Sequence, residues 1–189
     1  MRAKEEMRRL AKLVPSLDPV VASERSRSIA SRIGSHPSIL GARTIGIFFP
    51  LPGEVDLTSL WKLFPGKCVF PRVAAERMSL AFFAVTALSD LKPGYAKIPE
   101  PQTKTPCAVW RVTDVILVPG ICFDRLGGRI GSGKGFYDRF LSGVSATPWG
   151  VCFKEQIVDE ALAQEDTDVR MGALASDEGV YEVMPLGKH

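Results

Sequence analysis

The amino-acid sequence predicts an α/β protein, a three-layer sandwich with a mostly parallel, Rossmann-like central sheet that binds its ligands at the carboxyl ends of the strands. Apolar runs of strand length alternate with segments of helical periodicity along the chain. A glycine-rich stretch, 127–135, stands between one apolar run and a helix start, in the order strand, loop, helix. The 189 residues are enough for one domain with a substantial core and fewer than two domains usually need, so we expect a single domain, 1–189.

Residues 1–14 are predicted to form an amphipathic helix, because apolar residues recur there at the spacing of one buried face. Lys4, Arg8 and Lys12 follow one another at intervals of four residues and form a cationic row beside that face. In an isolated helix such a row is usually a solvated basic face. A phosphate-binding loop elsewhere in the chain would give it an anionic partner.

A second helix is predicted between Asp18, a good N-cap that precedes a proline, and Gly34, which suits the residue after a helix end. The apolar run 44–49 is predicted to be a buried strand, and the Pro-Leu-Pro-Gly cluster 50–53 is typical of a turn. A short helix is expected over 57–64.

Glu54 stands between this strand and the helix that follows it. Open α/β sheets bind their ligands where a strand ends and the next helix begins, so a carboxylate at this point is a candidate ligand contact. The alternative is an exposed loop charge with no role in binding.

Two further strands are predicted at 67–73 and 78–83. Residues 89–107 contain several prolines and no clear periodicity, so they are predicted to form a long loop without structure of its own. Such a loop is more often functional than idle, although an interdomain linker is the alternative. A buried strand follows at 114–119.

Beyond the glycine-rich stretch, the segment 136–141 is typical of a helix start. A strand is predicted at 148–153 and a helix at 154–163. The acidic stretch 165–170 is expected to be a turn, and a short strand is predicted at 180–183.

The segment 127–138 has the composition of a phosphate-binding loop, since it holds five glycines and the cations Arg129 and Lys134. Glycine lets the backbone take positive φ and approach a ligand closely. Consecutive backbone N–H groups can then point into one concavity and bind an anion. Asp138 could hold a metal ion that bridges phosphate oxygens. A plain surface turn is the alternative, but a turn rarely needs so many glycines interleaved with cations.

This loop matches neither of two familiar phosphate-binding motifs. Residues 128–134 have the spacing of a P-loop, Gly-x-x-x-x-Gly-Lys, but Gly135 stands where a P-loop has the Ser or Thr that binds Mg²⁺. The third glycine also comes one residue too early for the dinucleotide-binding motif.

The composition excludes several other classes of protein. A net charge of +3 does not require a nucleic-acid partner, and no apolar run is long enough to predict a membrane span. The four cysteines share no C-x-x-C spacing, so neither a zinc site nor a disulfide framework is expected. The N-terminus lacks the features of a secretory signal, so a cytoplasmic protein with free thiols is predicted. With only His36 and His189 in the chain, histidine base catalysis is not expected.

On these motifs the sequence resembles the 5-formyltetrahydrofolate cyclo-ligase family, also called methenyltetrahydrofolate synthetases, over nearly its full length. Residues 129–138, Arg-Ile-Gly-Ser-Gly-Lys-Gly-Phe-Tyr-Asp, look like the family signature Arg-x-Gly-x-Gly-x-Gly-x-Tyr-Asp. Further family segments are matched, in order, by Lys4-x-x-Met7-Arg8, by 53–56 (Gly-Glu-Val-Asp), by 98–101 (Ile-Pro-Glu-Pro) and by 118–124. Several ordered motifs are stronger evidence than one glycine loop.

The resemblance implies an enzyme, an ATP-dependent ligase that forms a C–N bond. The family converts 5-formyltetrahydrofolate to 5,10-methenyltetrahydrofolate with release of ADP and phosphate, through phosphorylation of the formyl oxygen and attack by N10. Phosphoryl transfer asks a protein mainly for positioning and charge neutralisation. The resemblance implies these site residues: Arg129 and Lys134 for catalysis; Lys4, Arg8, Arg129, Ile130, Gly131, Ser132, Gly133, Lys134, Gly135, Phe136 and Tyr137 for ATP; Phe49 and Glu54 for the folate; Asp138 and Asp168 for Mg²⁺.

The chain departs from the family pattern at a few positions. Ser132 stands where the family often has a bulkier or charged residue, and Phe136 replaces a tyrosine. Lys97 occupies a place often held by glycine, and Gly172 a place held by a second aspartate. Residues 176–177 read Ser-Asp in place of Thr-Glu. These changes bear on folate affinity and on the magnesium shell more than on the fold.

Two alternatives remain beside the cyclo-ligase hypothesis. One is a different ATP- or phosphosugar-using enzyme on this fold; Glu54 and the segment 98–101 argue against it, because the resemblance assigns them to the folate. The other is a non-catalytic nucleotide- or RNA-binding protein, which the near-neutral charge disfavours. The expected partners are therefore 5-formyltetrahydrofolate and ATP with Mg²⁺, for a monomer that binds neither nucleic acid nor membrane.

Overall fold

The computed structural model describes residues 17–74, 76, 78–102 and 109–183. The predicted helix 1–14, with Lys4 and Arg8, lies outside the described residues.

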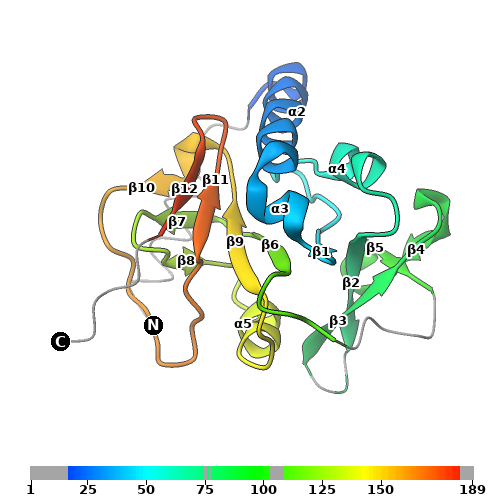
Figure 1. The fold of residues 1–189 in the computed structure, drawn as a ribbon. Helices are drawn as coiled ribbons and strands as arrows, with labels where there is room; N and C mark the ends of the chain where they lie inside the picture. Colours follow the sequence, from blue (N-terminus) through cyan, green and yellow to red (C-terminus); the bar gives the residue numbers. More distant parts are fainter. Residues whose placement is uncertain (1–16, 75, 77, 103–108, 184–189) are drawn as a thin grey trace.

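A seven-stranded sheet, counted over the described residues, has the strand order β12-β11-β9-β6-β1-β2-β3 (Figure 1). The inner strands β11, β9, β6, β1 and β2 pair parallel with one another, whereas the edge strands β12 and β3 pair antiparallel with β11 and β2. The strands are β1 (Ile45–Gly46), β2 (Cys68–Ala74), β3 (Ser79–Ala84), β6 (Val115–Pro119), β9 (Thr147–Val151), β11 (Ala173–Ala175) and β12 (Val180–Glu182). The predicted fold class, an α/β sandwich with a mostly parallel sheet, is confirmed.

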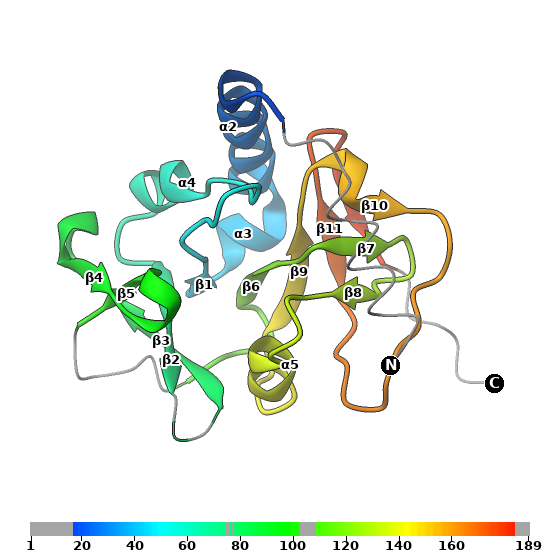
Figure 2. The same ribbon diagram turned by 180° about the vertical axis from the view of Figure 1, so that it is seen from behind.

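Both faces of the sheet are covered. Figure 1 shows α2 and α3 in front of the sheet, and Figure 2, seen from behind, brings α5, β7 and β8 to the front. The covering elements are α2 (Pro19–Ser35), α3 (Pro37–Gly41), α4 (Thr58–Leu63), α5 (Phe136–Leu141) and a small sheet of β7 (Cys122–Asp124), β8 (Arg129–Ile130) and β10 (Ile157–Val158).

The residues of β6 show how one strand serves two cores. Val115 and Leu117 pack in the core that holds α2, α3 and α4, whereas Ile116 and Val118 pack in the core that holds α5. Successive side chains of a strand point to opposite faces, so a strand covered on both sides is apolar throughout. This explains the continuous apolar run that predicted β6.

Helix α2 begins as its sequence predicts. The carboxylate of Asp18 accepts hydrogen bonds from the backbone N–H groups of Val20 (2.8 Å) and Val21 (3.4 Å), which a helix start leaves without partners. The helix continues to Ser35, one residue beyond Gly34. Its buried residues, among them Ile29, contribute to the first core.

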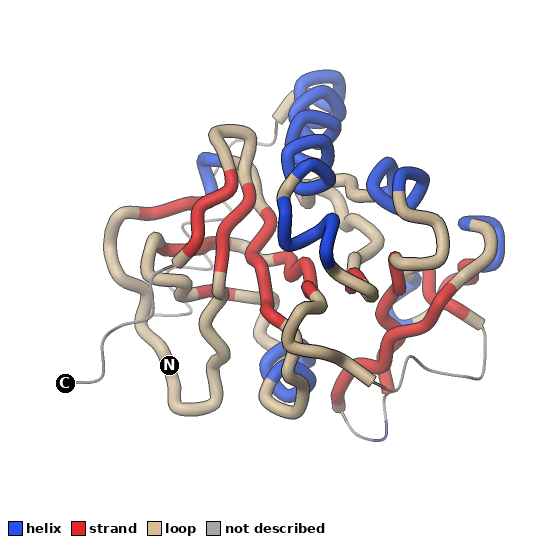
Figure 3. The backbone as a smooth tube through the Cα atoms, viewed as in Figure 1, coloured by secondary structure: helices blue, strands red, loops and turns tan. Residues whose placement is uncertain are grey.

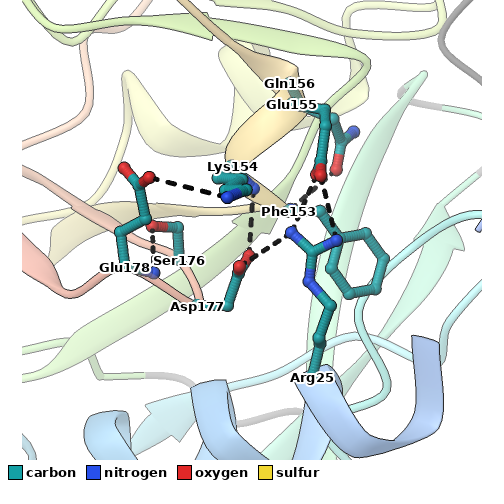
Figure 4. Close-up of polar contacts among 8 residues, drawn as sticks. All are labelled: Arg25, Phe153, Lys154, Glu155, Gln156, Ser176, Asp177 and Glu178. Atoms are coloured by element: carbon teal, nitrogen blue, oxygen red, sulfur yellow. Dashed lines mark hydrogen bonds and ion pairs between the residues drawn. The ribbon is translucent and has the colours of Figure 1, made fainter. Parts of the chain in front are cut away.

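Arg25 on α2 forms ion pairs with residues that follow β9 and β11 (Figure 4). The guanidinium of Arg25 donates to both carboxylate oxygens of Glu155 (3.0 and 2.8 Å) and to Asp177 (2.7 Å), and it lies 5.3 Å from the ring centroid of Phe153. Asp177 also accepts from the backbone N–H of Lys154. The Ser-Asp pair that departs from the family pattern thus has a structural partner in Arg25.

The prediction of a long unstructured loop over 89–107 is wrong in its described part. Strands β4 (Leu91–Pro93) and β5 (Pro99–Pro101) form a two-stranded antiparallel sheet there, and short 3-10 turns, Leu88–Asp90 and Tyr95–Lys97, precede and connect them. A proline cannot donate to a strand ladder, so it is found in edge strands. Both strands of a two-stranded sheet are edges, which is why a proline-rich segment can still pair.

The predicted helix over 154–163 is also wrong. The chain forms a single 3-10 turn, Lys154–Gln156, then β10, and then continues as the loop seen in Figure 3. The side-chain amide of Gln156 donates to the carbonyl groups of Gly120 (2.9 Å) and Ile121 (3.3 Å). Parallel pairing of β10 with β7 uses the backbone groups that a helix would have needed.

Cys68, Cys122 and Cys152 are free and buried, as expected, whereas Cys107 lies outside the described residues. Within the described ranges, no helix is both long and apolar enough to cross a membrane.

Candidate active site

A cavity of about 1050 Å³ opens where the central parallel strands end. Its lining includes Phe48 and Phe49, which follow β1, and Pro119 and Gly120 at the end of β6. Sheets of this class bind their ligands at this edge. The volume lies just above the usual range for small-molecule sites, about 300–1000 Å³.

The cavity brings together the predicted site residues that the structure describes. Phe49, Glu54, the whole run 129–138 and Asp168 contribute to its lining. Lys4 and Arg8 lie outside the described residues. The roles assigned to these residues remain predictions, but their proximity is a property of the fold.

The first two glycines of the predicted phosphate loop serve a different purpose. Gly127 (φ +81°) and Gly128 form the turn between β7 and β8, and a Cβ atom on Gly128 would lie 2.3 Å from Asp124 Oδ2. Asp124 is buried and accepts hydrogen bonds from the backbone N–H groups of Leu126 (2.8 Å), Gly128 (2.7 Å) and Leu162 (2.7 Å). A hairpin therefore stands between β6 and the loop, and the loop proper is 131–135.

Within this shorter loop, Gly133 (φ +93°) and Gly135 (φ +65°) have left-handed backbone conformations that other residues rarely adopt. Ser132, Gly133 and Lys134 are exposed and line the cavity. The segment that follows β8 is thus a glycine loop with its backbone against the cavity, as the sequence predicts.

Arg129 and Asp138 are bonded to each other across the base of this loop. Arg129 Nη2 donates to both carboxylate oxygens of Asp138, at 2.9 and 2.8 Å, and Nη1 donates to the Pro119 carbonyl at 3.4 Å. The backbone N–H of Val169 adds a contact to Asp138 at 3.4 Å. Arg129 Nε is buried and has no hydrogen-bond acceptor among the described residues.

Glu54 is placed by a turn whose sequence explains its shape. Residues 51–54 form a type II turn, with Pro52 at the second position and Gly53 (φ +87°) at the third. The N–H of Glu54 donates to the Leu51 carbonyl (2.9 Å), and Glu54 Oε2 accepts from the N–H of Leu51 (3.0 Å). Burial raises the pKa of Glu54, and the bond from Leu51 opposes this shift.

Tyr137 also lines the cavity, and the charge of Glu54 affects the pKa of its hydroxyl. Burial raises the pKa of the Tyr137 hydroxyl, the negative charge of Glu54 raises it further, and the positive charge of Arg129 lowers it. The hydroxyl therefore stays protonated at neutral pH and can donate a hydrogen bond to a ligand.

The hairpin of β4 and β5 contributes cavity residues that were not among the predicted site residues, although the resemblance had linked its segment 98–101 to the folate. The rings of Tyr95 and Phe136 meet edge to face, with centroids 5.4 Å apart, and so join this hairpin to the start of α5. Glu100 is buried and accepts from the N–H of Val73 (3.2 Å), and a Cβ atom on Gly94 would lie 2.1 Å from Glu100 Oε2. The Ile-Pro-Glu-Pro motif was the sequence signal for this wall.

The fit of a magnesium ion depends on Asp138 and Asp168. Asp168 Oδ2 accepts from the N–H of Glu165 (2.7 Å), and the described part of the chain contains no group of three or more metal-binding side chains. Mg²⁺ is usually bound by one or two carboxylates together with substrate phosphates. The two carboxylates are the right type of ligand for such an ion, and a nucleotide would supply the others, but both oxygens of Asp138 accept from Arg129 in this structure.

Comparison with known proteins gives consistent results. The model of the 5-formyltetrahydrofolate cyclo-ligase family matches residues 1–176. The chain is 30% identical over 178 residues to the 5-formyltetrahydrofolate cyclo-ligase of Escherichia coli K12, covering 88% of this chain and 96% of that protein. It is 27% identical over 198 residues to the enzyme of the same name from Mus musculus, covering 93% and 92% of the two chains.

Solved structures agree with this match. The NMR structure of 5,10-methenyltetrahydrofolate synthetase from Aquifex aeolicus superimposes with a TM-score of 0.82 at 27% identity, covering 98% of this chain and 97% of that chain. The 5,10-methenyltetrahydrofolate synthetase of Mycoplasma pneumoniae has the same fold, with a TM-score of 0.66 at 18% identity, covering 94% and 98% of the two chains.

Proposed function

Because this chain belongs to the 5-formyltetrahydrofolate cyclo-ligase family, we propose that it converts 5-formyltetrahydrofolate and ATP to 5,10-methenyltetrahydrofolate, ADP and phosphate. The observation that carries this proposal is one cavity with two chemically different walls. The glycine loop 131–135 with Lys134 forms one wall, and Phe49 with Glu54 contributes to the other. A reaction that joins a nucleotide to a second substrate needs both ligands in one cavity.

The reaction proceeds in two steps. The formyl oxygen of the substrate attacks the γ-phosphorus of ATP, and ADP leaves with the electrons of the broken P–O bond. The N10 lone pair then adds to the carbon of the resulting iminium phosphate. Phosphate departs with the former formyl oxygen, and N10 loses its proton.

The loop side of the cavity neutralises charge in the first step. The exposed Lys134 and the loop amides face the phosphates, and phosphoryl transfer depends mainly on such positioning and electrostatic stabilisation. Arg129 adds a second positive charge and holds Asp138 in place. Mg²⁺, held by Asp138, Asp168 and phosphate oxygens, would neutralise the charge of the phosphates.

The opposite wall orients the folate. Glu54, when ionised, accepts hydrogen bonds from pterin N–H groups, and the Phe49 ring offers an apolar surface. Lys4 and Arg8 are proposed to reach the phosphates from the N-terminal segment. The proposal also includes a monomeric, cytoplasmic enzyme that needs no nucleic acid, in keeping with the net charge of +3.

The direct test is to mix purified protein with Mg²⁺, ATP and 5-formyltetrahydrofolate and to follow the absorbance of the methenyl product together with ADP. Product that requires both ATP and Mg²⁺ is expected, and omission of ATP or addition of a chelator serves as the control. If ATP binds but no product forms, the nucleotide assignment stands and the folate assignment fails.

A further inference from the structure

We propose that Arg139 is a positioning residue for the nucleotide, because it holds the peptide between Lys134 and Gly135 in one orientation. Arg139 comes from α5 and was not among the predicted site residues, yet it contributes to the lining of the cavity. The inference rests on the proposed function, since it concerns how the glycine loop receives ATP.

Two hydrogen bonds fix the Arg139 side chain between separate segments. Its Nε donates to the Met78 carbonyl at 2.6 Å, and its Nη2 donates to the Lys134 carbonyl. The guanidinium also lies 5.8 Å from the ring centroid of Phe136. One side chain thus ties the turn between β2 and β3 to the glycine loop.

The bond to Lys134 determines where the next N–H group points. The described peptide bonds are all trans, and in a trans peptide the C=O and N–H groups point in opposite directions. With the Lys134 carbonyl held against Arg139, the Gly135 N–H is turned away from Arg139. No group in the described part of the chain accepts a hydrogen bond from this N–H, so it remains available to an anion.

Gly135 is needed for this arrangement for two reasons. Its φ of +65° favours glycine, and a Cβ atom at this position would lie 2.8 Å from Arg139 Nη1. Any larger residue would therefore both strain the backbone and displace the guanidinium. The third glycine of the 131–135 loop and the arginine four residues later act as one unit.

The same arginine links the loop to a third wall of the cavity, formed by β2 and β3. Val73 and Leu80, from the two strands that Met78 helps to join, contribute to the lining. Loss of the Arg139 bonds would free the loop from this wall while leaving Lys134 and the loop sequence unchanged. The expected defect is therefore weaker nucleotide binding, without a matching loss of folate binding.

The test compares Arg139→Met with Arg139→Lys and with Arg125→Met as a matched control. Methionine keeps most of the side-chain volume and removes the donors, whereas lysine keeps the charge with a single donor group. Arg125 pairs with Asp159 on the surface and does not line the cavity. Calorimetry measures the Kd of Mg²⁺-ATP without folate, and initial rates measure the KM of each substrate.

Arg139→Met is expected to raise the Kd and KM for ATP by about tenfold or more, as the loss of charge-assisted hydrogen bonds would predict, while the folate KM stays within about twofold. Arg139→Lys should fall between this variant and the wild type, and Arg125→Met should match the wild type. Gly135→Ala should raise the Kd similarly, and combining it with Arg139→Met should add little.

An unchanged Kd for ATP in Arg139→Met would overturn the proposal. So would an equal rise in both KM values together with a lower Tm, which a purely structural role would produce. If Arg139→Met fails to fold, Arg139→Lys tests the proposal by the same comparison of the KM for ATP with the KM for folate. If the wild type binds ATP but forms no product, the proposed reaction fails, while the Kd values still decide the role of Arg139.

Discussion

The carboxylate of Asp138 is held by Arg129, whose Nη2 lies 2.9 Å from Oδ1 and 2.8 Å from Oδ2. Arg129 belongs to β8 and Asp138 to α5, so the ion pair closes the loop 131–135 at its base. The two side chains are only 6% and 18% exposed. A buried pair that loses one partner leaves an uncompensated charge, so the shape of the loop depends on both residues.

This pairing predicts coupled effects on stability. Arg129→Met is expected to lower the free energy of unfolding by about 3 kcal/mol, because it leaves the Asp138 carboxylate without its partner. Asp138→Asn should also destabilise, and the double variant should lose less than the sum of the two single losses. Urea denaturation measures all three values, and strictly additive losses would contradict the pairing.

The control for this experiment is the exposed pair Arg125–Asp159, whose side chains are 57% and 92% exposed at a distance of 3.2 Å. Arg125→Met should change the free energy of unfolding by no more than about 0.5 kcal/mol.

Lys134→Ala tests the phosphate side of the cavity. The lysine is exposed, so its removal should leave Tm nearly unchanged, while kcat/KM for ATP is expected to fall by about 10²- to 10³-fold. Lys62→Ala removes an exposed lysine from α4, away from the cavity lining, and should retain full activity. Wild-type kinetics in Lys134→Ala would remove this lysine from the proposed mechanism.

Lys97→Gly is expected to stabilise the protein. Lys97 has φ +64°, a left-handed conformation that costs a residue with a side chain about 1–2 kcal/mol. Glycine would relieve this strain. The midpoint of urea denaturation should rise at unchanged slope, by the equivalent of about 1 kcal/mol.

The matched control is Lys92→Gly, in the neighbouring strand β4, where the backbone does not have a positive φ. Glycine is unfavourable in a strand, so this variant should be less stable than the wild type. Destabilisation by both glycines would mean that residue 97 is not strained.

The raised pKa of Glu54 predicts a dependence on pH. A carboxyl group with a higher pKa in the folded than in the unfolded protein binds its proton more tightly when folded. Its contribution therefore destabilises the fold as pH rises from the ordinary pKa of 4.5 through the raised value. Relative to Glu54→Gln, the wild type should lose stability as pH rises from the ordinary pKa of 4.5 through the raised pKa, measured as free energy of unfolding.

The raised pKa of Glu54 should affect folate binding in the opposite direction, because ionisation that destabilises the fold would improve binding of the folate. If ionised Glu54 binds the pterin, the folate KM of the wild type should fall as pH rises over the same interval, whereas Glu54→Gln should show a higher KM without this trend. Parallel pH profiles for the two proteins would exclude a charged Glu54 from folate binding.

Features that depend on neighbouring residues along the chain could be predicted from the sequence. Asp18 caps α2 because its short carboxylate side chain can reach the unpaired N–H two residues further on. Pro52 and Gly53 form the turn before Glu54 because their own φ preferences suit it. The apolar run of β6 and the glycines at 133 and 135 belong to the same class, so the fold class and the glycine-loop side of the cavity followed from local patterns.

Other features depend on residues that are far apart in the chain and compete for the same bonding partners. These features could be known only from the tertiary structure. Residues 154–163 favour a helix locally, but pairing of β10 with β7 and the contacts of Gln156 outweigh that preference. The proline-rich segment after Leu88 forms a hairpin that lines the cavity. Glu100 joins this hairpin to β2 by accepting a hydrogen bond from the N–H of Val73. Arg129 and Asp138 were assigned to separate ligands, and they bond to each other because folding removes both from water and makes an unpaired charge costly.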